Sequence, residues 1–167
     1  MYIKKKMQEA DKAKSARNGP VIKKNGIDNS FEQGNISENP QKGTLRGFHY
    51  QIDPYQESKT ISCITGSIFD VVIDLRKDSS TFLKSVSVQL SYKKKQSIFV
   101  PKGCANAWLT LESNTFIHYY MGSSYKPGFD RGIKFNDKFF DIEWPFDPKL
   151  VSEKDLEYPD FDPSNVV

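Results

Sequence analysis

The chain contains two histidines, His49 and His118, as candidates for acid–base chemistry. Neither belongs to a closely spaced group of histidines and a carboxylate that could hold a metal ion. The sequence also lacks a glycine-rich phosphate loop and the Gly-x-Ser-x-Gly turn of serine hydrolases. Cys63 and Cys104 are too few for a disulfide framework or a four-cysteine metal site. What remains is a metal-free pocket in which one histidine acts as a general base.

The elements that would position such a pocket are short, evenly spaced strands. Their β-branched and aromatic residues alternate or run together, and residues 101–103 and 112–114 between them are typical of turns. Nothing from residue 31 to 125 has a helical period, so we expect an all-β sandwich or barrel. Residues 67–75 are apolar enough for a strand buried on both faces. The expected strands are 60–65, 67–75, 85–90, 97–100, 107–111 and 115–120.

Composition limits the class of protein. The 167 residues suit one domain, and 37% hydrophobic with 27% charged residues suits a globular chain rather than a disordered one. No window is long and apolar enough to span a membrane, and the N-terminus lacks the apolar core of a signal peptide. Together with the low cysteine content, this predicts a cytoplasmic protein that has no membrane partner.

Positive charge is concentrated at the N-terminus. Residues 1–24 hold eight Lys and Arg against two acidic residues, so that the rest of the chain, with 16 basic and 19 acidic residues, has a net charge of −3. A nucleic-acid-binding domain would carry its basic residues on a folded face, so we expect no nucleic-acid partner. Breaker pairs near Pro20 and Gly26 predict a poorly structured segment 1–26, followed by a single domain over residues 27–167.

One segment has a specific pattern. Residues 43–51 read Gly-Thr-Leu-Arg-Gly-Phe-His-Tyr-Gln and resemble the signature of the dTDP-4-dehydrorhamnose 3,5-epimerase family, usually Gly-x-Leu-Arg-Gly-Leu-His-aromatic-Gln. Lys59 lies ten residues after His49, as the family's lysine does. The resemblance runs from about Phe31 to Asp155 through further motifs in the family's order: residues 68–76, 79–82, 100–103, 142–145 and 150–155.

The resemblance implies a double-stranded β-helix, the cupin-type jelly roll, here with a short C-terminal helical turn that begins at Ser152. It implies a homodimeric isomerase that needs no cofactor and no metal. The expected reaction is epimerisation of a nucleotide-linked 4-keto-6-deoxy sugar at C3 and C5, of the type that converts dTDP-4-dehydro-6-deoxy-glucose to dTDP-4-dehydro-L-rhamnose. The product would supply a deoxysugar for cell-surface polysaccharide.

The same resemblance implies the catalytic residues. His49 matches the family's base, Asp155 the carboxylate that orients it, and Tyr119 the acid on the opposite face of the sugar. Tyr119 can point into the pocket only if its neighbours His118 and Tyr120 point outward, because successive strand residues face opposite ways. The alternative for Asp155 is a cap of the last helical turn.

Substrate-binding residues are implied in the same way. Lys59 matches the lysine near the C4 oxygen, although an ordinary solvated lysine at a strand edge is the alternative. Arg46 matches the arginine that binds the diphosphate, and Tyr125 the aromatic residue that stacks on the base, with simple packing as its alternative. Further contact positions are Asp130, Lys154, Gln33 and Asn35, and a one-residue length difference before Thr44 blurs the last two.

The sequence departs from the family pattern at two places. Asn106 stands where a histidine usually contacts the sugar, and an amide can still donate a hydrogen bond to the C4 oxyanion but cannot carry charge. The usual opening strand, Asp-x-Arg-Gly-x-Phe-x-Glu, is not found in residues 1–30, which would weaken nucleotide binding, dimerisation or both. These departures leave open an epimerase that acts at C3 only or on another NDP-4-keto sugar, and a non-catalytic sugar-nucleotide-binding jelly roll.

Overall fold

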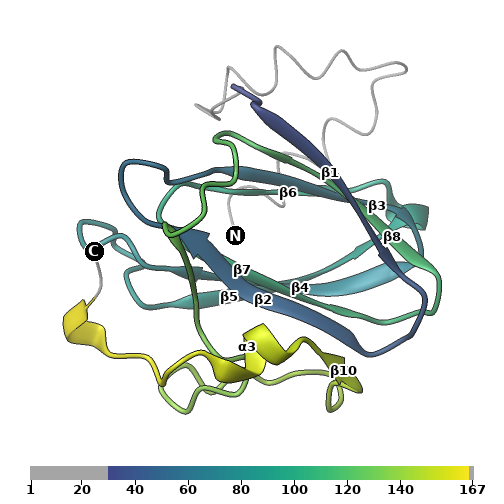
Figure 1. Cartoon of the computed structure of the whole chain (residues 1–167). Helices are drawn as coiled ribbons and strands as arrows, with labels where there is room; N and C mark the ends of the chain where they lie inside the picture. The colour runs from purple at the N-terminus through teal and green to yellow at the C-terminus, as the bar shows by residue number, and fades with distance from the viewer. Residues whose placement is uncertain (1–29, 166–167) are drawn as a thin grey trace.

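Two β-sheets face each other in the computed structural model, which describes residues 30–165 (Figure 1). The segment predicted to be poorly structured, 1–26, lies outside this range. The first sheet has the strand order β1-β8-β3-β6 and is antiparallel throughout. Its strands are β1 (Gln33–Asn39), β8 (Thr115–Met121), β3 (Lys59–Thr65) and β6 (Ser97–Val100).

The second sheet has the order β10-β2-β7-β4-β5, with β9 also paired to β2. Its one parallel pair is β10 with β2. The only α-helix of the described residues is α3 (Glu153–Glu157), and two 3-10 turns are η1 (Tyr92–Lys94) and η2 (Pro163–Asn165). The strands are β10 (Leu150–Val151), β2 (Thr44–Gln51), β7 (Cys104–Thr110), β4 (Ser67–Asp74), β5 (Ser85–Ser91) and β9 (Asp130–Gly132).

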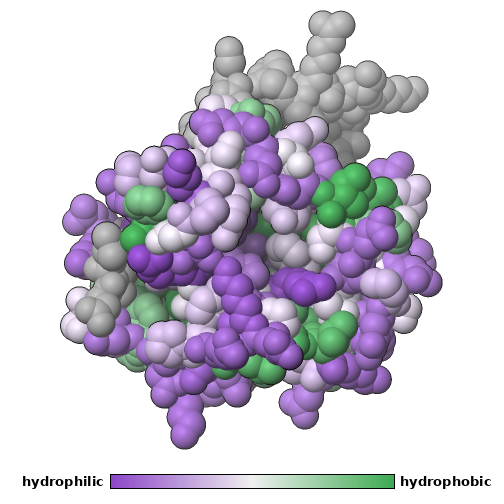
Figure 2. Space-filling view, viewed as in Figure 1, coloured by the Kyte–Doolittle hydropathy of each residue, from purple (hydrophilic) through white to green (hydrophobic). Residues whose placement is uncertain are grey.

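The β4 strand shows why residues 67–75 are apolar throughout. Ile68 and Val72 point between the sheets and join the core there, while Val71 and Ile73 point to the other face of the second sheet. That outer face is covered by the C-terminal segment, which runs beneath the sheet in Figure 1. The segment contributes Phe140, Ile142, Trp144 and Phe161 to a second apolar cluster. Figure 2 shows that the visible surface is mainly hydrophilic, with separate apolar patches.

The predicted all-β class is confirmed, and the two-sheet sandwich decides between the two architectures left open. The six predicted strands all form, although β7 begins at Cys104 rather than at residue 107. The helical turn also forms, and the Ser152 side chain caps it by accepting a hydrogen bond from the Asp155 backbone N–H. None of the helices described is long and apolar enough to cross a membrane.

A carboxylate at the end of β4 fixes the connection to β5. Asp74 is 6% exposed, and it accepts hydrogen bonds from the Arg76 guanidinium at 2.7 and 2.8 Å and from the Ser79 and Thr81 hydroxyls at 2.6 Å. Burial alone would raise the pKa of Asp74, but the hydrogen bonds from Arg76, Ser79 and Thr81 outweigh it and hold the pKa well below its usual range.

We expect Asp74→Asn to lower the free energy of unfolding by about 2–3 kcal/mol at pH 7, because it removes a charge-assisted acceptor from buried donors. A carboxyl whose pKa is lowered in the folded state stabilises the protein at pH values above its unfolded-state pKa of about 4. This contribution is lost as the pH falls below that value toward the folded-state pKa. Urea denaturation at several pH values measures the effect, with exposed Asp78→Asn as the control. An equal loss of unfolding free energy in both variants would contradict this role of Asp74. So would a difference between the parent and Asp74→Asn that persists at low pH.

Candidate active site

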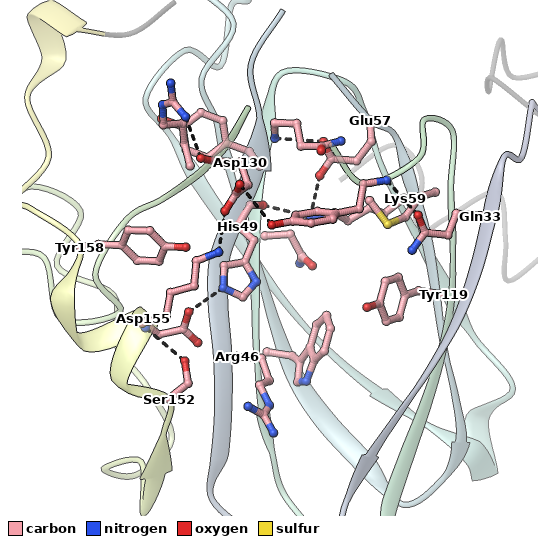
Figure 3. A pocket seen from close by; sticks show the side chains of 18 residues that line it. Gln33, Arg46, His49, Glu57, Lys59, Tyr119, Asp130, Ser152, Asp155 and Tyr158 are labelled. Atoms are coloured by element: carbon pink, nitrogen blue, oxygen red, sulfur yellow. Dashed lines mark hydrogen bonds and ion pairs between the residues drawn. The ribbon is translucent and has the colours of Figure 1, made fainter. Parts of the chain in front are cut away.

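A pocket of about 330 Å³ opens between the two sheets (Figure 3). Both sheets and the α3 helix contribute to its wall. All the residues predicted for the site line this pocket except Asn35. They are Gln33, Arg46, His49, Lys59, Asn106, Tyr119, Tyr125, Asp130, Lys154 and Asp155.

An irregularity in β2 brings two of these residues to the same side. The pairing of β2 with β7 shifts register between Arg46 and His49, and Phe48 between them is fully buried against Trp144 on the outer face. In a regular strand, residues three positions apart would face opposite sides. The bulge therefore allows both Arg46 and His49 to line the pocket.

Gly47 makes this bulge possible. Its φ is +106°, and a Cβ there would lie 2.5 Å from the Asn106 carbonyl oxygen and 2.9 Å from the Ala107 Cα. We expect Gly47→Ala to cost about 2–4 kcal/mol of stability, because it combines a left-handed φ with a clash against backbone. Gly128→Ala is the matched control, because φ is +88° there but nothing lies within 4 Å of the added Cβ. Thermal unfolding compares the two, and equal losses would show that φ alone matters.

His49 and Asp155 form a hydrogen-bonded pair in the pocket. His49 Nε2 lies 2.6 Å from Asp155 Oδ1, and Asp155 Oδ2 accepts a hydrogen bond from the Gly47 N–H at 3.2 Å. Burial would raise the pKa of Asp155, but the hydrogen bond and charge of His49, with the Gly47 and Ser152 bonds, lower it below its usual value. Asp155 thus remains a carboxylate that orients the imidazole and leaves Nδ1 to accept a proton. It carries this contact in addition to its place in the capped first turn of α3.

Tyr119 enters the pocket from the opposite sheet, on β8. Its ring packs on Trp108 at 5.7 Å between centroids, whereas His118 and Tyr120 contact each other on the outer face at 4.5 Å. This alternation is the one that an inward Tyr119 requires. Burial raises the pKa of Tyr119, partly offset by the charge of Arg46, so the phenol keeps its proton at neutral pH. Figure 3 shows Tyr119 and His49 on opposite sides of the cavity.

Lys59 is buried rather than solvated. Its side chain is 8% exposed, and Nζ donates to the His49 carbonyl oxygen at 2.9 Å and lies 3.1 Å from Glu57 Oε1. Glu57 also lines the pocket, with a side-chain exposure of 4%. Nothing in the local sequence pattern marked Glu57, because its burial depends on how residues 52–58 fold back over the end of β2. The strand-edge alternative for Lys59 does not fit this environment.

The outer part of the pocket is held together by polar contacts around Tyr125, which is 48% exposed. Its backbone N–H donates to Gln33 Oε1 at 2.8 Å, and its hydroxyl donates to Asp130 at 3.2 Å. Lys154 also pairs with Asp130. The Arg46 side chain makes no ion pair or hydrogen bond with other residues in 30–165, so its guanidinium is available for an anionic ligand. Tyr125 thus presents an open ring beside cationic groups.

The two asparagines differ from expectation. Asn35 does not line the pocket, and its side chain instead accepts a hydrogen bond from Gln33 at 2.8 Å. Asn106 does line it, but its amide donates to Asp70 Oδ1 at 2.9 Å and to the Val71 carbonyl at 3.2 Å. Both amide hydrogens are thereby used. In this arrangement Asn106 offers no donor to an oxyanion, contrary to the help expected from it.

The pocket also contains an aromatic residue that the sequence did not indicate. Tyr158 follows α3, and its ring lies edge-on to His49 at 6.3 Å between centroids. It can come this close because Gly132, the partner of His49 across β2 and β9, has no side chain, and a Cβ there would overlap the Tyr158 ring. Figure 3 shows its hydroxyl directed toward the cavity. Tyr158 therefore forms the pocket wall on one side of His49.

The pocket of this two-sheet jelly roll places a histidine–aspartate pair opposite a protonated tyrosine, an arrangement of a base and an acid that suits proton transfer. No group of three or more His, Cys, Asp or Glu side chains in residues 30–165 is placed to hold a metal ion. The sequence matches the dTDP-4-dehydrorhamnose 3,5-epimerase family over residues 15–163, and the chain belongs to this family. It is thus an isomerase of the sugar-nucleotide epimerase class, which confirms the family and the enzyme class expected from the motifs.

Individual relatives agree with this assignment. The dTDP-4-dehydrorhamnose 3,5-epimerase of Shigella flexneri is 40% identical over 126 residues, which cover 75% of this chain and 69% of that protein. The crystal structure of the Bacillus anthracis epimerase with TDP and PPi bound is 37% identical, with a TM-score of 0.82, over 85% of this chain and 81% of the other. A 3'-monoepimerase from Streptomyces bikiniensis, in complex with dTDP-quinovose, is 28% identical with a TM-score of 0.78, over 87% and 74% of the two chains.

Proposed function

We propose that the protein inverts C3 and C5 of dTDP-4-dehydro-6-deoxy-glucose and so forms dTDP-4-dehydro-L-rhamnose for dTDP-rhamnose biosynthesis. The observation that carries the proposal is the placement of His49, oriented by Asp155, opposite Tyr119. A proton next to the C4 ketone is acidic enough to be removed by a base, which leaves an enolate. Return of a proton from the other face then inverts the carbon.

Each residue has one task in this scheme. His49 Nδ1 takes the proton from the carbon, and the C–H electron pair moves into the enolate with negative charge on the C4 oxygen. Tyr119 then donates its phenolic proton to the opposite face. One inversion leaves His49 protonated and Tyr119 deprotonated, so both exchange protons with water before the next inversion. The reaction is redox-neutral and needs no cofactor.

The same pocket supports binding of a sugar diphosphate nucleotide. Lys59 is a buried cationic donor that hydrogen-bonds the His49 carbonyl, and we assign it to the C4 oxygen. Arg46 and Lys154 are the cations assigned to the diphosphate, for which Arg is suited by its two-pronged geometry. The exposed ring of Tyr125 is assigned to stacking on the base.

Proton NMR in deuterated water tests the proposal with dTDP-4-dehydro-6-deoxy-glucose as substrate. Loss of both the C3 and the C5 proton signals, with formation of the L-rhamno product, is the expected result. Absence of exchange at either carbon, when a control epimerase turns over the same substrate, would overturn it. Parallel samples with GDP- and CDP-linked 4-keto sugars identify a different nucleotide preference.

Inversion at C3 alone is the second candidate, and the side chain of Asn106 favours it. Both of its N–H groups are taken by Asp70 and Val71, so the enolate receives one hydrogen-bond donor fewer than an imidazole could supply. The NMR experiment separates this candidate by retention of the C5 proton. A purely binding role has less support, because a binding module has no use for a base and an acid on opposite faces.

We further propose a cytoplasmic homodimer formed through the outer face of the first sheet. Three large apolar side chains are exposed on this face: Ile36 of β1 is 63% exposed, Phe31 just before β1 44% and Tyr120 of β8 41%, and the last two rings lie 4.9 Å apart. Apolar clusters of this kind mark interfaces, and a twofold dimer needs only this one self-complementary surface.

Light scattering coupled to size-exclusion chromatography tests the dimer. Full-length protein is expected at twice its 19.1 kDa mass, and Ile36→Glu at the monomer mass. Val86→Glu is the control, because Val86 is 53% exposed on β5 of the other sheet. A monomeric parent protein would overturn the proposal.

A further inference from the structure

The structure assigns a role to a carboxylate that neither the sequence motifs nor the acid–base pair includes. We propose that Glu57 is a positioning residue that holds the Lys59 ammonium in place and aims one of its N–H groups at the C4 oxygen of the substrate. The inference rests on the proposed function, since it concerns the donor assigned to the developing enolate.

The contacts around Lys59 leave it a single free donor. An ammonium has three N–H groups. One is directed to the His49 carbonyl oxygen at 2.9 Å and a second to Glu57 Oε1 at 3.1 Å. Lys59 and Glu57 both line the pocket, so the third N–H is the one available to a ligand. Two fixed acceptors thus convert a flexible side chain into an oriented donor, which is the arrangement that stabilises a developing oxyanion.

Glu57 is itself fixed by the backbone. Its second oxygen, Oε2, accepts the Gln51 N–H at 3.0 Å. The Gln51 side chain in turn accepts the Lys126 N–H at 2.6 Å and donates to the Tyr55 and Ser124 carbonyls. The carboxylate is therefore held by the end of β2, which also carries His49, so the base and the lysine are positioned from one strand end.

The charges in this part of the pocket show why the partner must be anionic. A buried ammonium is costly unless a counter-charge lies beside it. The other carboxyl that faces Lys59 is Asp70 on β4, which is fully buried. Burial raises the pKa of Asp70 to about 8, against the opposing effects of the Asn106 hydrogen bond and the Lys59 charge, so Asp70 is largely neutral at pH 7. Asp155 is occupied by His49 on β2, and Tyr119 on β8 is protonated. Glu57 is left as the compensating charge.

Glu57→Gln tests the inference because it keeps the shape of the side chain and an acceptor for Gln51 but removes the charge. We expect kcat to fall about 10- to 100-fold while KM changes less than about threefold, since the lost effect concerns the enolate rather than ground-state binding. Asp160→Asn, which removes the exposed partner of Lys134, is the matched ion-pair control and is expected to change neither value.

A double-mutant cycle separates positioning from general destabilisation. If Glu57 acts through Lys59, then Glu57→Gln added to Lys59→Met lowers kcat no further than Lys59→Met alone. An additional loss of similar size in the double variant, or a Glu57→Gln enzyme whose kcat equals that of the parent, would overturn the inference.

A second measurement does not depend on turnover. In protein with 13C-labelled lysine, the Lys59 Cε signal, assigned by its loss in Lys59→Met, is expected to show faster side-chain motion in Glu57→Gln than in the parent, because one of the two acceptors that hold the ammonium loses its charge. The same side-chain motion in both proteins overturns the inference even if the parent epimerises no substrate. Absence of turnover with a changed Lys59 side-chain motion would instead refute only the proposed reaction.

Discussion

His49→Gln is expected to lower the rate of solvent exchange at C3 by about 10²–10⁴-fold, the contribution typical of a general base. In the parent protein His49 Nε2 lies 2.6 Å from Asp155 Oδ1. The glutamine side-chain amide keeps a nitrogen that can donate to this oxygen, so the buried carboxylate is not left without a partner. What is lost is Nδ1, the atom proposed to accept the substrate proton. Substrate affinity should change little, because the cations assigned to the diphosphate are untouched.

Exchange followed by NMR in deuterated water measures this loss, and an unchanged melting temperature shows that the fold is intact. His118→Gln is the control, because His118 is the other histidine and contacts Tyr120 on the outer face of the sheet. A His49→Gln enzyme that exchanges C3 at the parent rate would remove His49 from the role of base.

The parts of the fold that the sequence predicted are those that depend on local pattern. The apolar run at residues 67–75 became β4, because both faces of that strand are covered by apolar clusters. The alternation around Tyr119 predicted which side chains point inward, because the period of a strand is two wherever it is regular. The helical turn at Ser152 follows from a capping side chain, which is also a local signal.

The parts that the sequence did not predict depend on contacts between distant residues. Arg46 and His49 share one side only because a bulge at Gly47 breaks the period of two, and the crowding that requires a glycine comes from Asn106 and Ala107 on β7. The burial of Glu57 and the two acceptors of the Asn106 amide are likewise set by tertiary packing. The family motifs located the residues of the pocket, but the geometry of their hydrogen bonds came from the structure.

Tyr119→Phe is expected to separate proton exchange from inversion. Removing the phenol deletes the donor on one face, so formation of the inverted product should fall by about 10²–10⁴-fold. His49 and Asp155 remain, so the C3 proton can still leave, exchange with deuterated water on His49, and return to the face from which it came. The ring and its packing on Trp108 are kept, so stability should be unaffected.

The distinction is measurable because exchange and inversion have different NMR signatures in one sample. The expected record is loss of the C3 proton signal from substrate that keeps its original configuration, which neither a misfolded protein nor a pure binding module would produce. Tyr120→Phe is the matched control, since Tyr120 is the next residue but lies on the outer face, 41% exposed. Parent-like inversion in Tyr119→Phe would mean that another donor protonates the enolate, for example Tyr158, whose ring lies 6.3 Å from that of His49. Exchange with retained configuration in Tyr119→Phe would instead assign the two faces of the sugar to the two sheets, with His49 acting from β2 and Tyr119 from β8.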